Sequence, residues 1–132
     1  MGFNPSIVAK DAADGVGAVD YRLQRRRTLR EVREGIIARN EVCDAHPELL
    51  RVARNSAPET GKKCPICEDE QLVSVTYVFG PRLPAGGKLA LSRTELDRIA
   101  LRSGTFASYQ VEVCGGCGWN HLLRRQVLEG RA

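Results

Sequence analysis

Two Cys-x-x-Cys motifs, separated by 46 residues, constrain this 132-residue chain more than any other feature of its sequence. The first reads CPIC, with Cys64 and Cys67, and the second reads CGGC, with Cys114 and Cys117. Two residues between a pair of thiols let the backbone turn so that both sulfurs face one point, and two such turns supply four thiolates in a tetrahedron. The sequence therefore predicts that two distant parts of the chain meet around one metal ion.

We call residues 64–68 the first knuckle and residues 114–118 the second knuckle. The second knuckle is rich in glycine, which suits a tight turn because its backbone needs positive φ near the second cysteine. The whole chain has one Trp, three Tyr and three Phe, which are few large core residues for its length. A metal ion would therefore add folding free energy that a thin core lacks.

Structural zinc, one ion per chain, is the preferred interpretation of the four cysteines. A tetrahedral Cys₄ site also suits iron, as in an electron carrier of the rubredoxin type. A disulfide within each pair is disfavoured because no secretion signal is apparent, and a thioredoxin-like redox pair is disfavoured because neither motif opens a helix after a strand. A closed site leaves no position for an activated water, and no nucleophile has an evident base, so we expect no enzymatic activity.

The cysteine pattern resembles the zinc-ribbon family over about residues 62–126, where CPIC, a strand and a hairpin with the turn CGGCGW come one after another. This resemblance implies structural zinc on the four motif cysteines. The spacer between the motifs exceeds the usual ~15–20 residues, which we attribute to an inserted loop and helix over residues 81–106. Glu68 also stands where ribbons commonly have Gly. The whole chain is similar to an actinobacterial family of small, uncharacterised zinc-ribbon proteins, which implies no activity.

Cys43, His46 and His121 are potential ligands outside the two motifs. We expect Cys43 to be buried at a helix end, His46 to cap the next helix and His121 to lie in the sheet or on the surface. Cys43 and His46 could form a second ligand pair, but nothing nearby completes a separate site. The letters HPE at 46–48 followed by CPIC imitate a zinc-deaminase signature. That interpretation fails because Lys63 replaces the required proline and the second motif would be unused.

The expected fold class is α+β, in three parts. Residues 1–17 show no periodic pattern and are interpreted as a flexible arm. Residues 18–60 form a helical segment, and residues 61–132 form the zinc-ribbon domain. Within the helical segment, a helix is predicted over residues 18–39, which contain one glycine and no proline.

A second, shorter helix is predicted after residue 43. Asp44 or His46 would cap it, and Pro47 suits the first helical position.

The zinc-ribbon domain is expected to hold a three-stranded antiparallel sheet. Apolar residues alternate over residues 71–80, which predicts a strand with one buried face. FASYQVEV and GWNHLLRRQV are interpreted as two further strands around the glycine turn. Between the first and second strands, Ser92 and Glu95 form a capping box that opens an inserted helix.

The first predicted helix is strongly basic, because residues 22–33 contain six arginines and one acidic residue while the net charge of the chain is +4. Such a face predicts salt-dependent contacts with nucleic-acid phosphates. The alternatives are docking on an acidic protein surface and a solvated helix whose long side chains cover apolar surface. The candidate binding residues are Arg22, Arg25, Arg26, Arg30 and Arg33, and the surface would be extended by Lys62, Lys63, Arg124 and Arg125.

The sequence as a whole is interpreted as a zinc-binding, non-catalytic module. Its expected partner is nucleic acid or the transcription or translation machinery, and the alternative is a protein-interaction adaptor that uses the ribbon as scaffold. No run approaches the about 20 apolar residues of a membrane span, so we expect a cytoplasmic protein with neither a membrane partner nor a small-molecule substrate. Trp119 is expected to pack over the metal site rather than stack on a base.

Overall fold

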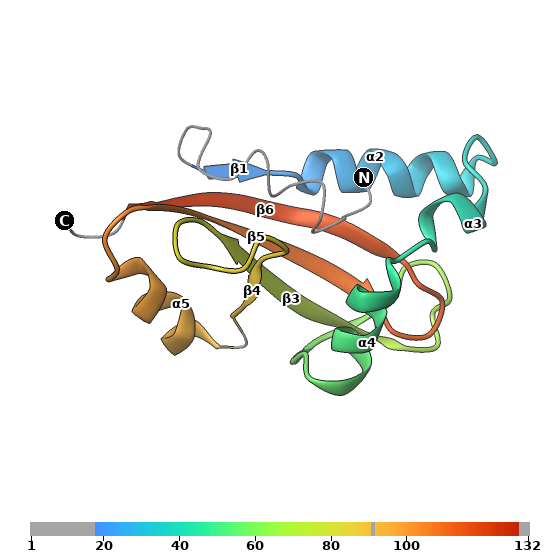
Figure 1. Ribbon diagram of the computed structural model, residues 1–132. Helices are drawn as coiled ribbons and strands as arrows, with labels where there is room; N and C mark the ends of the chain where they lie inside the picture. The colour runs from blue at the N-terminus through green and yellow to red at the C-terminus, as the bar shows by residue number, and fades with distance from the viewer. Residues whose placement is uncertain (1–17, 91, 130–132) are drawn as a thin grey trace.

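The computed structural model describes residues 18–90 and 92–129 and has an α+β architecture (Figure 1). Its centre is a six-stranded antiparallel sheet with the strand order β1-β6-β5-β3-β2, and β4 pairs with β3 off this path. The elements in chain order are β1 (Ala18–Asp20), α2 (Arg22–Arg33), α3 (Arg39–Val42), α4 (Pro47–Asn55), β2 (Glu59–Lys63), β3 (Gln71–Phe79), β4 (Lys88–Leu89), α5 (Arg93–Ala100), β5 (Thr105–Cys114) and β6 (Asn120–Glu129).

The three long strands β3, β5 and β6 match the three strands that the alternating pattern predicts. Three short strands, β1, β2 and β4, extend the sheet to six. The side chains of β1 and β2 are exposed, so their sequences lack the apolar alternation that marks a buried strand. The prediction of three strands therefore underestimates the sheet. The short strands are held by pairing with their neighbours and carry no sequence pattern of their own.

One face of the sheet is covered by α4. Its first residue is Pro47, and the Nδ1 atom of His46 accepts a hydrogen bond from the backbone N–H of Glu48 at 3.2 Å. His46 is thus the helix cap, as the sequence predicts. The helix buries one apolar stripe against alternate residues of β3 and β5, where burial of apolar surface stabilises the fold. The buried residues of this layer include Leu49, Val52, Ala53, Val73, Val75, Tyr77, Val111 and Val113.

The opposite face of the sheet is covered at one end by α5. Ser92 accepts a hydrogen bond from the backbone N–H of Glu95 at 3.2 Å, which caps this helix at the predicted position. Ile99 is buried and packs in one cluster with Val78 and Phe106. The inserted helix therefore closes the end of the sheet that lies away from the two knuckles, as Figure 1 shows.

The helix expected over residues 18–39 is shorter in the structure. Ala18–Asp20 forms β1, which pairs with β6 and places Asp20 opposite Arg124. Helix α2 then runs over Arg22–Arg33, and Gly35 adopts a φ of +76° just beyond its end. Propensity alone favours a longer helix, but pairing with β6 and the positive φ of Gly35 end it at both sides.

The predicted flexible arm, residues 1–17, lies outside the described residues. Within residues 18–90 and 92–129, every helix is too short or too polar to cross a membrane.

Candidate metal centre

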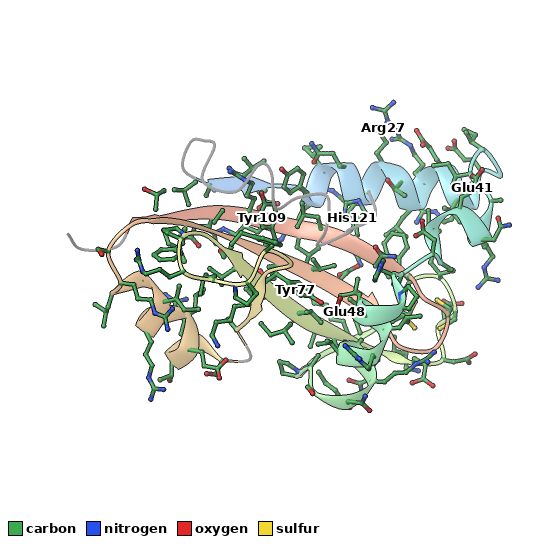
Figure 2. All side chains as sticks on the ribbon, in the orientation of Figure 1. Arg27, Glu41, Glu48, Tyr77, Tyr109 and His121 are labelled. Carbon is green, nitrogen blue, oxygen red and sulfur yellow. The ribbon has the colours of Figure 1, made fainter. Side chains whose placement is uncertain are left out.

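The sulfur atoms of Cys64, Cys67, Cys114 and Cys117 all lie within 4.8 Å of one another. The Sγ atoms of Cys64 and Cys117 are 3.7 Å apart, and so are those of Cys67 and Cys114. A tetrahedron with metal–sulfur bonds of ~2.3 Å has edges of about 3.8 Å. The four cysteines are therefore close enough to hold a metal ion, and Figure 2 shows sulfur atoms gathered at the end of the sheet near α3 and α4.

Antiparallel pairing brings the two knuckles together. The first knuckle lies between β2 and the start of β3, and the second begins at the last residue of β5. Because β3 and β5 run in opposite directions, Leu72 near the start of β3 pairs with Cys114 at the end of β5. The two motifs, distant in sequence, therefore meet at one end of the sheet.

The two knuckles have nearly the same backbone hydrogen bonds. The N–H of Glu68 donates to the carbonyl of Cys64 at 3.1 Å, and the N–H of Gly118 donates to the carbonyl of Cys114 at 3.0 Å. Each turn has a positive φ just after its second cysteine, 59° at Glu68 and 91° at Gly118. The glutamate that departs from the ribbon pattern thus adopts the conformation that a glycine would take.

Backbone N–H groups also point at the sulfurs. The N–H of Ile66 lies 3.4 Å from the Sγ of Cys64, and the N–H of Trp119 lies 3.4 Å from the Sγ of Cys117. Donors directed at sulfur favour the thiolate form, which is the form that binds metal.

The thiols differ in their tendency to ionise. Burial raises the pKa of Cys64 far above the ordinary thiol value, and burial likewise raises the pKa of Cys117 to about 12. Burial also acts to raise the pKa of Cys67, but hydrogen bonds from the backbone of Asp69 and Glu70 outweigh it and lower that pKa to about 7. A metal ion entering this site must displace protons from the buried thiols, so metal binding releases protons and strengthens as pH rises.

Arginines from two helices bind the knuckles from outside. The Nη2 atom of Arg39, on α3, donates to the carbonyl of Ile66 in the first knuckle at 2.6 Å. The Nε atom of Arg54, on α4, donates to the carbonyl of Gly115 in the second knuckle at 2.8 Å. The N-terminal helices therefore hold the carbonyl groups of both turns, although local sequence patterns give no sign of these contacts.

Trp119 is fully buried and packs in one apolar cluster with Leu29, Cys64 and Cys114. This placement agrees with packing over the metal site. Its Nε1–H donates to the carboxylate of Glu112 at 2.8 Å. A base cannot stack on a ring with no exposed surface, so the alternative of base stacking is wrong.

Glu112 is a buried carboxylate that sequence reasoning missed. Its Oε2 atom accepts from Trp119 and also from the Nε of Arg25 at 2.6 Å, which ties α2 to β5. The alternation of β5 places this residue on the face below α2. An acidic residue in a strand is usually exposed, so only the presence of a partner on another element could reveal its role.

His121 lies in β6 and is fully buried. Its ring stacks on Trp119, with centroids 5.8 Å apart, and its Nδ1 is 2.7 Å from the carbonyl of Leu122. Burial lowers the pKa of His121 to about 4, so the imidazole is neutral and its Nδ1–H donates to that carbonyl. Within the described part of the chain, its Nε2 has no hydrogen-bond partner.

Cys43 caps the C-terminal end of α3, at a helix end as expected, but it is half-buried rather than buried. Its Sγ atom lies 3.5 Å from the Sγ of Cys117. The sequence gives no signal for this proximity, because the two cysteines lie 74 positions apart and only the tertiary fold brings α3 to the second knuckle.

The arginines of α2 differ in exposure and in pairing. Arg25 is half-buried in the ion pair with Glu112. Arg27, which points away from the sheet in Figure 2, pairs with Glu31 at 3.2 Å on the exposed side. The exposed arginines of this helix that remain are Arg22, Arg26, Arg30 and Arg33.

The flanking basic residues are divided between the faces of the sheet. Lys62 lines a hollow together with Arg22 and Arg26, so it extends the basic surface of α2. Arg124 is exposed, whereas Arg125 is buried on the other face with its Nε donating to the hydroxyl of Tyr109 at 3.0 Å. The expectation that Arg125 extends the basic surface is therefore wrong, because neighbouring residues of a strand point to opposite faces.

A comparison of this chain with known proteins places it among relatives of similar length. It is 46% identical over 110 residues to uncharacterised proteins Rv0049 of Mycobacterium tuberculosis (strain H37Rv) and Mb0050 of Mycobacterium bovis, covering 83% of this chain and 80% of each relative. No solved structure matches. A family model matches residues 14–132. On this match the chain belongs to DUF5318, a family of unknown function.

Proposed function

We propose that this protein is a zinc-ribbon-like, non-catalytic module that binds nucleic acid through α2. Zn²⁺ on the four cysteines stabilises the end of the sheet on which α2 rests, and exposed arginines of α2 contact phosphates. The observation that carries the proposal is the two-sided arrangement of this helix. One side packs against the cysteine cluster and is tied to β5 by an ion pair, and the other side presents arginines to solvent.

The attachment uses an apolar contact and a buried ion pair. Leu29 is 8% exposed and shares a cluster with Cys64, Cys114 and Trp119. One turn earlier, Arg25 reaches the buried carboxylate of Glu112. Loss of the metal would disturb the cluster under Leu29, so metal binding and the position of α2 are coupled.

The exposed side of α2 has the charge and the length for phosphate contacts. Arg26, Arg30 and Arg33 line an open hollow along the helix, and Arg22 and Lys62 line the next one. A helix of 12 residues is ~18 Å long, which is enough to face several phosphates of one nucleic-acid strand. The arginine guanidinium also matches phosphate geometry in a way that lysine does not.

Tetrahedral Cys₄ geometry suits both metals, and zinc is proposed over iron because this chain is basic, with a net charge of +4, and has few aromatic residues, whereas rubredoxins are acidic and rich in aromatic residues. Metal content measured by mass spectrometry on native protein tests this choice. One zinc per chain and a colourless protein are the expected result. Stoichiometric iron and visible absorbance would instead support an electron carrier of the rubredoxin type.

A protein-interaction adaptor is the second candidate, and one observation favours it. Leu23 is 66% exposed within the basic surface of α2, and Ile36 beyond the end of that helix is 68% exposed. Apolar side chains among arginines would suit an acidic, amphipathic protein surface better than a phosphate backbone.

A salt-dependent titration separates the two candidates. Labelled duplex and single-stranded oligonucleotides are titrated with the zinc-loaded protein at several salt concentrations. For a phosphate-binding helix, log K falls linearly with log salt, and each lost contact reduces the slope by about 0.9 on duplex DNA. We expect the double variant R26A/R30A to show a weaker affinity and a shallower slope than the parent.

The matched control removes the same charge elsewhere. Arg98 and Arg102 are exposed, and Figure 1 shows that α5 and the turn after it lie at the far end of the sheet. The double variant R98A/R102A should keep the parental slope. Equal losses in both variants would point to a net-charge effect, and no binding at low salt would support the adaptor instead.

A further inference from the structure

A fifth sulfur stands beside the proposed metal centre without belonging to it. Cys43 donates toward the Sγ of Cys117 at 3.5 Å, which is shorter than the 3.7 Å between ligand sulfurs. Cys43 is nevertheless outside the group of four cysteines whose sulfurs all lie within 4.8 Å of one another. It therefore contacts one of the four sulfurs, that of Cys117, and adds no fifth ligand to a four-coordinate ion.

We propose that Cys43 and Cys117 form a peroxide-sensitive site, in which a disulfide between them removes one ligand from the metal centre. The proposal rests on the proposed metal function, because a ligating sulfur is held as the thiolate and the thiolate is the nucleophile toward peroxide. The chemical class of the reactant is hydrogen peroxide or a small organic hydroperoxide.

Exposure selects this pair among the five cysteines. Cys64 and Cys114 are 1% and 0% exposed, whereas Cys43 and Cys117 are both half-buried and so can be reached by a small oxidant. Cys67 is also half-buried, but its close sulfur neighbour is the buried ligand Cys114. Among the close sulfur pairs, Cys43 and Cys117 alone combine two half-buried residues with a partner that the metal does not use.

The surrounding backbone holds the pair in place. The N–H of Ala45 donates to the carbonyl of Gly118 at 3.0 Å, and the side chain of Asn120 donates to Asp44 at 3.2 Å. A Cβ atom on Gly118 would lie 2.9 Å from the carbonyl oxygen of Cys43, so this glycine permits the close approach of the two segments. The sulfurs need to move together by about 1.5 Å to reach the bond length of ~2.05 Å.

The chemistry balances in two steps. The Cys117 thiolate attacks one peroxide oxygen, the O–O bond breaks, and with one proton from solvent the products are a Cys117 sulfenic acid and water. The Cys43 thiol then attacks the sulfenic sulfur, forming the S–S bond and releasing a second water. Two sulfurs are each oxidised by one electron, and the two peroxide oxygens are reduced to water. Only three ligand sulfurs are left, which weakens the hold on the ion.

The test uses zinc-loaded, full-length protein treated with one equivalent of hydrogen peroxide. Released zinc is read with a chromogenic chelator, and disulfides are mapped by mass spectrometry under non-reducing conditions. Trypsin places Cys43 on peptide 40–51, the first motif on peptide 64–82 and the second motif on peptide 103–124. We expect zinc release together with a cross-link between peptides 40–51 and 103–124, assigned to Cys117 by fragmentation, and full rebinding of zinc after reduction.

Two results would overturn the inference. One is a first disulfide that links peptides 64–82 and 103–124 while Cys43 stays reduced. The other is irreversible oxidation of a ligand cysteine with no cross-link to Cys43. The variants Cys43→Ser and Cys43→Ala serve as controls, since both should bind one zinc as the parent does and give only ligand–ligand cross-links or overoxidised ligands.

The failure of this site is separable from failure of the metal centre. Metal stoichiometry is measured before oxidant is added, so a protein without zinc contradicts the proposed function on its own. A protein that binds one zinc but never forms the Cys43–Cys117 bond contradicts only this inference.

Discussion

The two knuckles share a backbone geometry, but the residues after each turn have different surroundings. From the last residue of the first knuckle the chain runs into solvent, since Glu68, Asp69 and Glu70 are all exposed. From the last residue of the second knuckle it runs into the core, since Gly118 and Trp119 are buried. The same turn is thus closed once by polar residues and once by packed ones.

The difference explains the choice of residue at the positive-φ position. At Glu68 the left-handed conformation carries a side chain, and that side chain is free to extend into solvent. At Gly118 the backbone lies against the carbonyl of Cys43, and a Cβ atom would meet that oxygen at 2.9 Å. Glycine is therefore required at the second knuckle by close packing as well as by φ, whereas at the first knuckle only φ favours it.

The largest expected effect is on stability, and it compares one cysteine from the first knuckle, Cys67, with one from the second, Cys114. Both Cys67→Ser and Cys114→Ser remove a ligand and should lower the free energy of unfolding by about 3 kcal/mol or more. Cys114→Ser should cost about 1–3 kcal/mol beyond this, because it places a hydroxyl group among buried apolar side chains. Urea denaturation of the parent and both variants, with and without chelator, measures these differences.

Chelator provides the control for this comparison. It should destabilise the parent strongly and the two variants little. Equal stabilities of Cys67→Ser and Cys114→Ser would contradict the claim that burial of the second knuckle adds to the cost of losing its cysteine.

A smaller effect is expected from pH, through the buried segment just beyond the second knuckle. The pKa of His121 is about 4 in the folded state, below its ordinary value of 6.5, so the unfolded state binds the proton more tightly. This group therefore contributes stability above pH 6.5, and that contribution, up to about 3 kcal/mol, is lost as pH falls toward 4. For the parent and His121→Phe, denaturation between pH 4 and 8 should show that the parent's free energy of unfolding, measured relative to the variant's, falls by up to about 3 kcal/mol as pH drops.

The variant is the control, because protonation of the four cysteines changes the stability of both proteins alike. The difference between their free energies of unfolding therefore isolates the contribution of His121. An NMR titration that finds His121 ionising near pH 6.5 in the folded protein would contradict the burial on which the prediction rests.

The smallest effects come from the positive-φ positions, as a matched pair. Gly118→Ala should destabilise the protein by about 2 kcal/mol through left-handed strain and the contact with Cys43. Glu68→Gly should stabilise it by about 0.5–1 kcal/mol, because the conformation costs a glycine less. Thermal unfolding of the zinc-loaded variants tests both, and effects of the same sign would show that the two turns are not distinguished by packing.

Features set by neighbouring residues were predicted from the sequence. The alternation over 71–80 marks β3, and the caps at His46 and Ser92 lie where the local pattern places them. The grouping of the four cysteines was also predictable, because the spacing within each motif directs both of its sulfurs to one side of a turn.

Features that depend on long-range pairing were not predictable. β1 and β2 carry no periodic pattern, and the buried role of Glu112 depends on Arg25 from a distant helix. The division of Arg124 and Arg125 between opposite faces required the register of β6, which contains an irregularity opposite Gln110 and Val111. A one-residue shift in a strand exchanges its faces, so local sequence cannot decide which arginine is exposed.

The sequence by itself determined the four sulfurs and the two turns that carry them, because each turn is made by adjacent residues and needs no distant partner. Only the tertiary structure decided that Cys43 lies against Cys117 and that one side of α2 packs against the cluster of four cysteines. Those contacts join segments far apart in the chain, and burial of apolar surface and antiparallel pairing, rather than any local preference, bring them together.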